Sequence, residues 1–267
     1  MQYIDVHSHL NLPEFKDDLA SVIARLRAHE IATIVVGVDR ETSQLAVELA
    51  LRYENIYASV GQHPVDNKDE MFDPMFYEKL VARGKVVAIG ECGLDYFRLK
   101  EESAIEKIRQ RELFAKQIEL ACTLDLPLML HARPTKDTMD AYEDVLAILA
   151  SYSSLYTSKL RGNVHFFVGD VSIAERFLAL GFTMSFTGVV TFTTEYDAVI
   201  AQLPLTAILA ETDAPFAAPV PHRGKRSEPE HVALVIEHIA KVRQEKLEVV
   251  KQALVTNAER VFGLKKG

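Results

Sequence analysis

The feature that most constrains the fold of this chain is a regular alternation of short apolar runs with longer amphipathic stretches. Some runs, such as VVAIG at 86–90, contain no polar residue at all. Continuous apolar runs predict strands that are buried on both faces, as the strands of a parallel sheet are. Eight strands are predicted: Tyr3–His7, Thr33–Val38, Ile56–Val60, Val86–Gly90, Pro127–His131, Asn163–Phe167, Phe182–Phe186 and Ala207–Glu211.

The stretches between these runs have helical spacing. It is clearest at 103–124, where apolar residues recur among Lys, Arg, Gln and Glu, and two further helical segments follow Glu230. Eight strand–helix units in 267 residues predict an α/β fold, a (β/α)8 barrel, with a doubly wound open sheet as the alternative. Because no linker, low-complexity tract or repeat interrupts the pattern, residues 1–267 are interpreted as one domain.

Composition and charge limit the class of protein. Two cysteines, Cys92 and Cys122, indicate no disulfide framework and are interpreted as buried small hydrophobic residues. The sequence shows neither a signal peptide nor the ~20 apolar residues of a membrane span, so we expect a soluble, cytoplasmic protein without a membrane partner. The formal net charge of −8 argues against a broad basic surface for long nucleic acid. Any phosphate binding must therefore be local.

Polar side chains recur where the predicted strands end. The first strand runs through Asp5-Val6-His7-Ser8-His9. Since residues i and i+2 of a strand project to the same face, His7 and His9 can offer two imidazoles to one ion. Asp5 is expected on that face too, either lower in the barrel or as the partner that orients a histidine.

Five more strand ends carry such residues. They are Gly61-Gln62-His63-Pro64, Gly90-Glu91-Cys92-Gly93-Leu94-Asp95, His131-Ala132-Arg133, His165 within VHFF, and Glu211-Thr212-Asp213-Ala214-Pro215. In a parallel barrel these ends converge on one face. Burying unpaired carboxylates and imidazoles is costly, so their gathering predicts a cation that pairs them. The other histidines lie in helical or loop stretches and are interpreted as structural or solvated: His29, His222, His231 and His238.

As a set, the blocks DxHxH, GxHP, GExGLD, HxR and ETDxP resemble the TatD family of metal-dependent hydrolases, the TatD-type deoxyribonucleases, over residues 5–264. The resemblance implies a TIM barrel of the metallo-dependent hydrolase type with two divalent ions: Zn, Mn, Co, Ni or Mg. It implies that His7 and His9 ligate one metal and that His131 and His165 ligate the other. Glu91 would bridge the two, and Asp213 would ligate the first.

The resemblance also implies catalytic roles. Asp213 would position or deprotonate the attacking water beside the bridging Glu91, and His63 would contact the scissile phosphate or the leaving group. Secondary candidates for phosphate contacts are Arg133 and, from the basic Pro/Gly-rich loop at 217–229, Arg223 and Arg226.

Three departures from the family pattern bear on substrate preference more than on hydrolysis. After His165 the family commonly has Cys-Phe-Ser-Gly, where this chain has Phe166-Phe167-Val168-Gly169. In the basic loop, Ser227 replaces the Asn of the family's RGKRNEP. The segment between His131 and His165 is also lengthened, with SYSSLYTSKLRGN at 151–163. None of the three departures removes a predicted metal ligand.

Three functions remain open at this point. The favoured one is a phosphodiesterase or deoxyribonuclease that acts on short or single-stranded DNA by metal-activated water, as a monomer. The second is a metal-dependent amidohydrolase or esterase, for example one that deacylates D-aminoacyl-tRNA. The third is a non-catalytic metal-binding module, which the retention of all six predicted ligands argues against.

Overall fold

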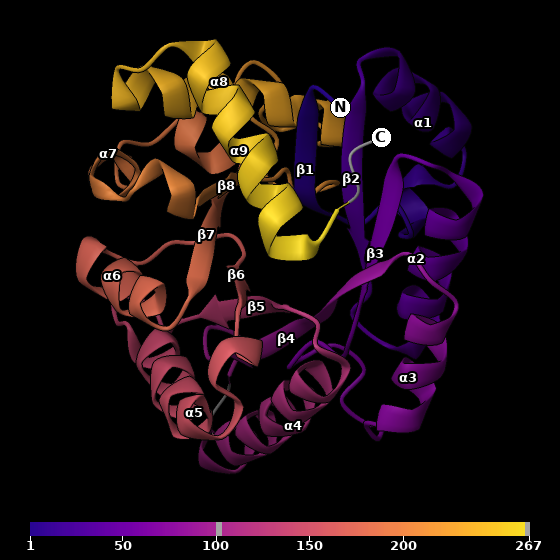
Figure 1. Cartoon of the computed structure of the whole chain (residues 1–267), viewed down its shortest axis with the longest axis vertical. Coiled ribbons are helices and arrows are strands. Elements are labelled where there is room, and N and C mark those ends of the chain that lie inside the picture. Colours follow the sequence, from indigo (N-terminus) through magenta and orange to yellow (C-terminus); the bar gives the residue numbers. More distant parts are fainter. Residues whose placement is uncertain (100–102, 265–267) are drawn as a thin grey trace.

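Eight parallel strands in chain order form the barrel in Figure 1, a computed structural model that describes residues 1–99 and 103–264. Each strand pairs with its neighbour in the sequence, so the order confirms the (β/α)8 barrel and excludes the doubly wound sheet, whose strand order reverses. The strands are β1 (Tyr3–Ser8), β2 (Ile31–Val36), β3 (Ile56–Val60), β4 (Val86–Asp95), β5 (Leu128–Arg133), β6 (Gly162–Val164), β7 (Phe182–Phe186) and β8 (Ile208–Ala210).

Helices surround the strands (Figure 1). They are α1 (Leu19–Ala28), α2 (Arg40–Arg52), α3 (Pro74–Ala82), α4 (Ser103–Leu124), α5 (Asp140–Tyr156), α6 (Val171–Ala179), α7 (Asp197–Gln202), α8 (Val232–Arg243) and α9 (Leu247–Phe262). Short 3₁₀ helices are η1 (Pro13–Phe15), η2 (Thr157–Lys159), η3 (Gly188–Thr191), η4 (Leu205–Ala207) and η5 (Pro229–His231). Within the described ranges, no helix is long and apolar enough to cross a membrane.

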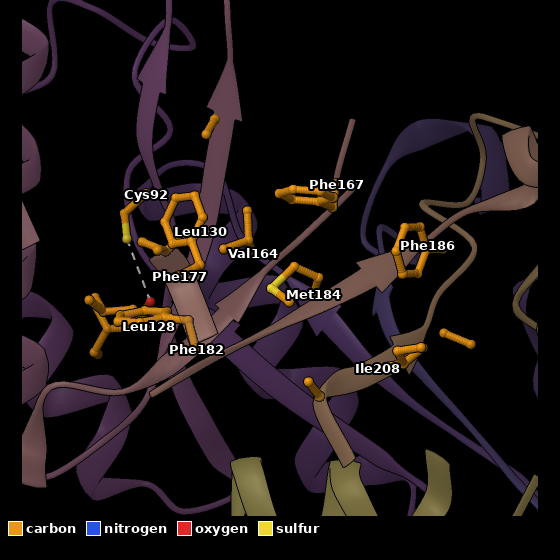
Figure 2. Packing of buried hydrophobic residues seen from close by; sticks show 14 of the residues in the cluster. Cys92, Leu128, Leu130, Val164, Phe167, Phe177, Phe182, Met184, Phe186 and Ile208 are labelled. Carbon is orange, nitrogen blue, oxygen red and sulfur yellow. Dashed lines mark hydrogen bonds between the residues drawn. The ribbon is translucent and has the colours of Figure 1, made fainter. Parts of the chain in front are cut away.

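The apolar core has two parts, one on each side of the strands. Between the strands and the outer helices, side chains from β5, β6 and β7 pack against Phe177 of α6 (Figure 2). The second part joins Val255, Ala258 and Phe262 of α9 to residues of the strands such as Ile4. Each large apolar side chain buried in this way contributes about 1.5–3 kcal/mol. Cys92 and Cys122 are buried free thiols, as predicted.

A bulge in β1 sets the direction of the first histidines. The register pairs Asp5 with Thr33 and Ser8 with Val35, so β1 has one residue more than β2 between these pairs. An extra residue reverses the alternation of side chains along a strand. Asp5 therefore lies on the face of Thr33, opposite to His7, and the expectation that Asp5 shares the histidine face is wrong.

Instead, Asp5 joins the first strand to the last. Its carboxylate accepts hydrogen bonds from the backbone N–H and the hydroxyl of Thr212, both at 2.8 Å. Beside them, the N–H of Asp213 donates to the carbonyl of His7 (2.9 Å) and the N–H of His9 to that of Ala214 (2.7 Å). These bonds close the barrel between β1 and the segment that follows β8. The closure places Asp213 next to the two histidines.

A second bulge lies in β4, which continues to Asp95 rather than ending at Gly90 as predicted. Ile89 pairs with Leu128 and Cys92 with Leu130, so β4 again has one extra residue. Because Cys92 packs in the outer core, its neighbour Glu91 projects toward the inside of the barrel. Glu91 thus lies within a strand and not in a loop after it.

The other strand predictions differ from the structure at their ends only. β3 and β7 have the predicted bounds, and β6 ends at Val164 instead of Phe167. The reason is Phe166, whose φ of +46° interrupts the extended backbone. His165 therefore follows the strand, although its N–H still donates to the carbonyl of Leu130 across the β5–β6 ladder (2.9 Å).

We expect Gly93→Ala to lower the free energy of unfolding by about 2–5 kcal/mol. Gly93 has a φ of +139°, and a Cβ there would overlap the carbonyl oxygen of His131 on β5. Strain at positive φ costs about 1–2 kcal/mol and overpacking a further 1–3 kcal/mol. Gly84→Ala is the control, since Gly84 also has a positive φ but open space around it. Urea unfolding measures both variants, and equal losses would refute a specific role for the β4–β5 contact.

Candidate metal centre

Six side chains from distant parts of the chain meet at the carboxyl ends of the strands. His7 and His9 come from β1 and the residue after it, Glu91 from β4 and His131 from β5. The other two, His165 and Asp213, follow β6 and β8. Their nitrogen and oxygen atoms form overlapping groups of three in which all atoms lie within 4.8 Å of one another: His7–His9–Glu91, His7–His165–Asp213 and Glu91–His131–His165.

Glu91 divides this cluster into two halves. Its Oε2 lies 3.4 Å from Nε2 of His7 and 3.8 Å from Nε2 of His9. Its Oε1 lies 2.8 Å from Nδ1 of His131 and 3.0 Å from Nε2 of His165. One carboxylate therefore presents a different oxygen to each pair of imidazoles.

Asp213 belongs to the first half. Its Oδ1 lies 3.4 Å from Nε2 of His9 and 3.8 Å from Nε2 of His7. The two histidine nitrogens are themselves only 3.2 Å apart. A second carboxylate and two imidazole nitrogens thus surround one small space on the Oε2 side of Glu91.

Outer partners fix which ring nitrogen faces inward. Nδ1 of His9 lies 3.1 Å from the carbonyl of Val36, which can only accept, so this nitrogen carries the proton. Nε2 of His131 lies 3.3 Å from Oδ2 of Asp95. A proton held on the outer nitrogen leaves the lone pair of the inner one for a cation, as in carboxylate–histidine–metal arrangements. The donors therefore fit a divalent cation on each side of Glu91.

Glu211 lies behind His165, in the half of the cluster on the Oε1 side of Glu91. Its Oε2 accepts from the hydroxyl of Ser185 (2.7 Å) and its Oε1 from the N–H of Phe166 (2.6 Å). Nδ1 of His165 lies 3.3 Å from the same Oε1, without the alignment of a hydrogen bond. The buried charge of Glu211 thus lies directly behind a candidate ligand.

The charges of the cluster compensate one another. Burial favours the neutral form of Glu91, but the charges of His165 and His63 and hydrogen bonds from His131 and His165 hold its pKa well below the ordinary value. Burial also opposes the charged form of His165, yet the charges of Glu91 and Glu211 raise its pKa well above the ordinary value. Buried imidazolium and carboxylate groups hence stabilise one another when no cation is bound.

The cluster opens into a cleft of about 660 Å³ that His63 and Arg133 also line. Nδ1 of His63 lies 2.7 Å from Oδ2 of Asp66, and its Nε2 lies 3.7 Å from Oε1 of Glu91. The guanidinium of Arg133 stacks 4.1 Å over the ring of Phe97. Both residues thus stand where the resemblance implies contact with a substrate.

Arg223 and Arg226 do not line the cleft. Arg226 bonds to Asp18 (2.6 and 2.8 Å) and to Glu228 (2.9 Å), and so fastens its loop to the start of α1. Arg223 stacks 4.2 Å over the ring of Phe192. The structure does not support the phosphate contacts implied for these two residues, because neither lies in the cleft and Arg226 is held in ion pairs elsewhere.

Four polar residues of the site were not assigned a role from the sequence. Asp95 and Glu211 lie in the strand-end blocks GLD and ETD, which was the signal that could have identified them. Asp66 follows His63 by three residues, whereas nothing in the sequence singles out Arg98, which lines the cleft with Nε 3.6 Å from Oδ2 of Asp95. Such partners depend on spatial proximity that a motif does not encode.

A (β/α)8 barrel with clustered imidazoles and carboxylates at the carboxyl ends of its strands defines the class of metal-dependent barrel hydrolases. Within that class, the chain belongs to the TatD family, because the family described as TatD related DNase matches residues 4–263. This membership confirms the resemblance drawn from the motifs and makes the chain a metal-dependent hydrolase.

Individual relatives agree over nearly the whole chain. The uncharacterized metal-dependent hydrolase YabD of Bacillus subtilis is 39% identical and covers 97% of this chain and 98% of its own. YcfH of Escherichia coli, also described as an uncharacterized metal-dependent hydrolase, is 32% identical over 98% of this chain and 96% of its own. The crystal structure of YjjV, a TatD homologue from E. coli, superposes with a TM-score of 0.88 at 28% identity, covering 99% of both chains.

Glu91→Gln is expected to lower metal content to less than about a tenth of that of the wild type. The substitution removes the charge shared by both halves, and even outer partners of metal ligands are worth roughly 10–100-fold in affinity. Elemental analysis after dialysis against micromolar zinc measures the effect. Glu70→Gln, a partly buried carboxylate outside the cleft, is the control and should keep the wild-type content. Full metal content in Glu91→Gln would contradict the bridging position.

Metal binding is expected to release protons and to strengthen as the pH rises from 6 to 8. Burial opposes the charged forms of His131 and His9, but hydrogen bonds to Asp95 and Asp213 respectively raise their pKa values above the ordinary ~6.5. Raised pKa values stabilise the metal-free protein below pH ~6.5, and this stabilisation is lost as the pH rises through the folded-state values. Zinc titration calorimetry in buffers of different ionisation enthalpy measures the release, because the observed heat then changes with the buffer. Identical observed heats in all buffers would refute it.

Proposed function

We propose that this chain is a two-metal phosphodiesterase that hydrolyses short or single-stranded DNA. The observation that carries the proposal is the carboxylate of Glu91, whose two oxygens face two separate sets of donors. A symmetric pair of divalent ions is the arrangement that suits in-line displacement at phosphorus. The description of the family as TatD related DNase supports DNA as the substrate.

His7, His9 and Asp213 would hold one ion with Oε2 of Glu91, and His131 and His165 would hold the other with Oε1. The nitrogen-rich donor set favours Zn, Mn, Co or Ni over Mg. When bound, such ions lower the pKa of water and offset the charge that develops on a phosphate.

Asp213 is the base in this proposal. Burial raises its pKa, but the hydrogen bond with His9 and the charges of His7 and His9 lower it below the ordinary value, so the carboxylate stays ionised. It lines the cleft and can therefore accept a proton from an attacking water.

His63 is suited to act as the acid that protonates the leaving oxygen. Asp66 takes up its Nδ1, so that proton exchange with a substrate has to use Nε2. Burial and the charge of His131 lower the pKa of His63. An anionic phosphate beside Nε2 would favour the protonated ring, which could then donate to the leaving oxygen.

The cleft limits what can bind. Its guanidinium groups are Arg98 and Arg133, and Arg98 already neighbours Asp95. With a net charge of −8, the chain lacks the charge balance that favours tracking of long duplex DNA. Binding of one phosphate and its immediate neighbours by a monomer is therefore the form of recognition that we propose.

Wild-type protein is expected to release nucleotides from single-stranded DNA only with added divalent metal, and Glu91→Ala to abolish the release. His63→Ala should lower kcat roughly 100-fold on DNA, whose leaving alkoxide needs a proton, and much less on a p-nitrophenyl diester, whose leaving phenolate does not. Chromatography of the products and absorbance of p-nitrophenolate measure the two reactions.

The control is Phe192→Leu, outside the cleft, which should leave both rates unchanged. If DNA stays intact at high concentrations of enzyme and metal while an amide or a carboxylic ester is hydrolysed, the phosphodiesterase proposal is refuted. The amidohydrolase or esterase alternative would then take its place. Equal losses of kcat on DNA and on the p-nitrophenyl diester would refute the role of His63 as the acid.

A further inference from the structure

The chain that follows β6 divides its side chains between two environments. Phe167 is buried, and its ring centroid lies 5.4 Å from that of Tyr142 and 6.3 Å from that of Phe186. Figure 2 shows Phe167 and Phe186 in this core. Its neighbours Phe166 and Val168 both line the cleft instead. The two positions that depart from the family's Cys-Phe-Ser-Gly are therefore the two that face a substrate.

Phe166 is held in place before any substrate arrives. Its backbone has a φ of +46°, in the left-handed region that residues other than glycine rarely adopt. Its N–H donates to Oε1 of Glu211 (2.6 Å), and the N–H of Val168 donates to the hydroxyl of Tyr142 (2.9 Å). Surroundings that fix an unfavourable backbone in this way are typical of functional sites.

A second aromatic ring lies on the other half of the metal centre. Phe216 lines the cleft with 51% of its surface exposed, and its ring centroid is 6.2 Å from that of His9. Phe166 stands edge-on to His165 at 6.1 Å. Each half of the centre thus has one phenyl ring at its border, and the N–H of Phe216 donates to the carbonyl of the candidate ligand Asp213 (2.8 Å).

We infer that Phe166 selects nucleoside diesters over alkyl diesters by stacking on the nucleobase next to the scissile phosphate, with Phe216 as the opposite wall. This inference rests on the proposed phosphodiesterase function. Stacking on a phenyl ring accepts any base, because each base has a π-face, and a fixed backbone at Phe166 keeps the ring at this border of the cleft. Arg133, in the same cleft, supplies a cation for the phosphate.

The test compares two diesters that release the same p-nitrophenolate, thymidine 5′-(p-nitrophenyl phosphate) and methyl p-nitrophenyl phosphate. Phe166→Leu keeps an apolar side chain but removes the aromatic face. We expect it to raise the ratio of the two KM values, thymidine ester over methyl ester, roughly tenfold. Phe166→Tyr, which retains the face, should keep the wild-type ratio, as should Phe192→Leu outside the cleft. Metal content and circular dichroism establish that each variant is folded and loaded.

An unchanged ratio in Phe166→Leu would overturn the inference, because it would show that the ring does not recognise the base. If Phe166→Leu does not fold, Phe166→Tyr decides the question. A ratio of KM values in Phe166→Tyr that differs from the wild-type ratio would also overturn the inference. If the wild type hydrolyses neither ester, the proposed function fails, and equilibrium dialysis of thymidine 5′-monophosphate decides the inference separately. Weaker binding to Phe166→Leu than to the wild type then supports the stacking role, and equal binding refutes it.

Discussion

The structure depends on one buried negative charge, the carboxylate of Glu91. It lies 4% exposed among five imidazoles, where an unpaired charge would cost several kcal/mol. Protons on His131 and His165, whose pKa values are raised, supply positive charge beside it, and bound cations would replace those protons. Metal binding and the protonation of the cluster are consequently alternatives, and the same residues that stabilise the metal-free barrel are those that a metal would deprotonate.

That charge points inward because of backbone irregularities rather than regular strands. In β1 and in β4 one extra residue reverses the alternation just before or at a candidate ligand, so that His7 and Glu91 project into the barrel. The same reversal in β1 turns Asp5 away from the histidines and toward Thr212, across the closure of the barrel. Closing the barrel and aiming the ligands are therefore two results of one local geometry.

The sequence predicts the regular strands and helices, but it does not predict the bulges. The predicted bounds of β3, β7 and α4 are correct. Short apolar runs indicate strands and apolar residues at helical spacing indicate helices, and in these three elements the pattern is not interrupted. The six strand-end residues could be grouped because parallel strands bring their carboxyl ends together. The face of Asp5 could not be predicted, since a bulge changes the face without changing the apolar pattern. The expected phosphate contact of Arg226 is wrong for a different reason. Its partner Asp18 lies about two hundred residues away in the sequence, so the sequence does not reveal their ion pair.

The segment after β6 separates positions that the metal centre and the core constrain from positions that line the cleft. His165 faces the metal centre and Phe167 faces the core, so both positions are constrained by many neighbours. Phe166 and Val168 alternate with them, and the contacts that hold them are mainly backbone hydrogen bonds, which do not depend on the side chain. Substitutions at these two positions can therefore reshape the cleft while leaving both the ligand and the core intact. In this chain both positions carry apolar side chains, which form part of the wall of the cleft.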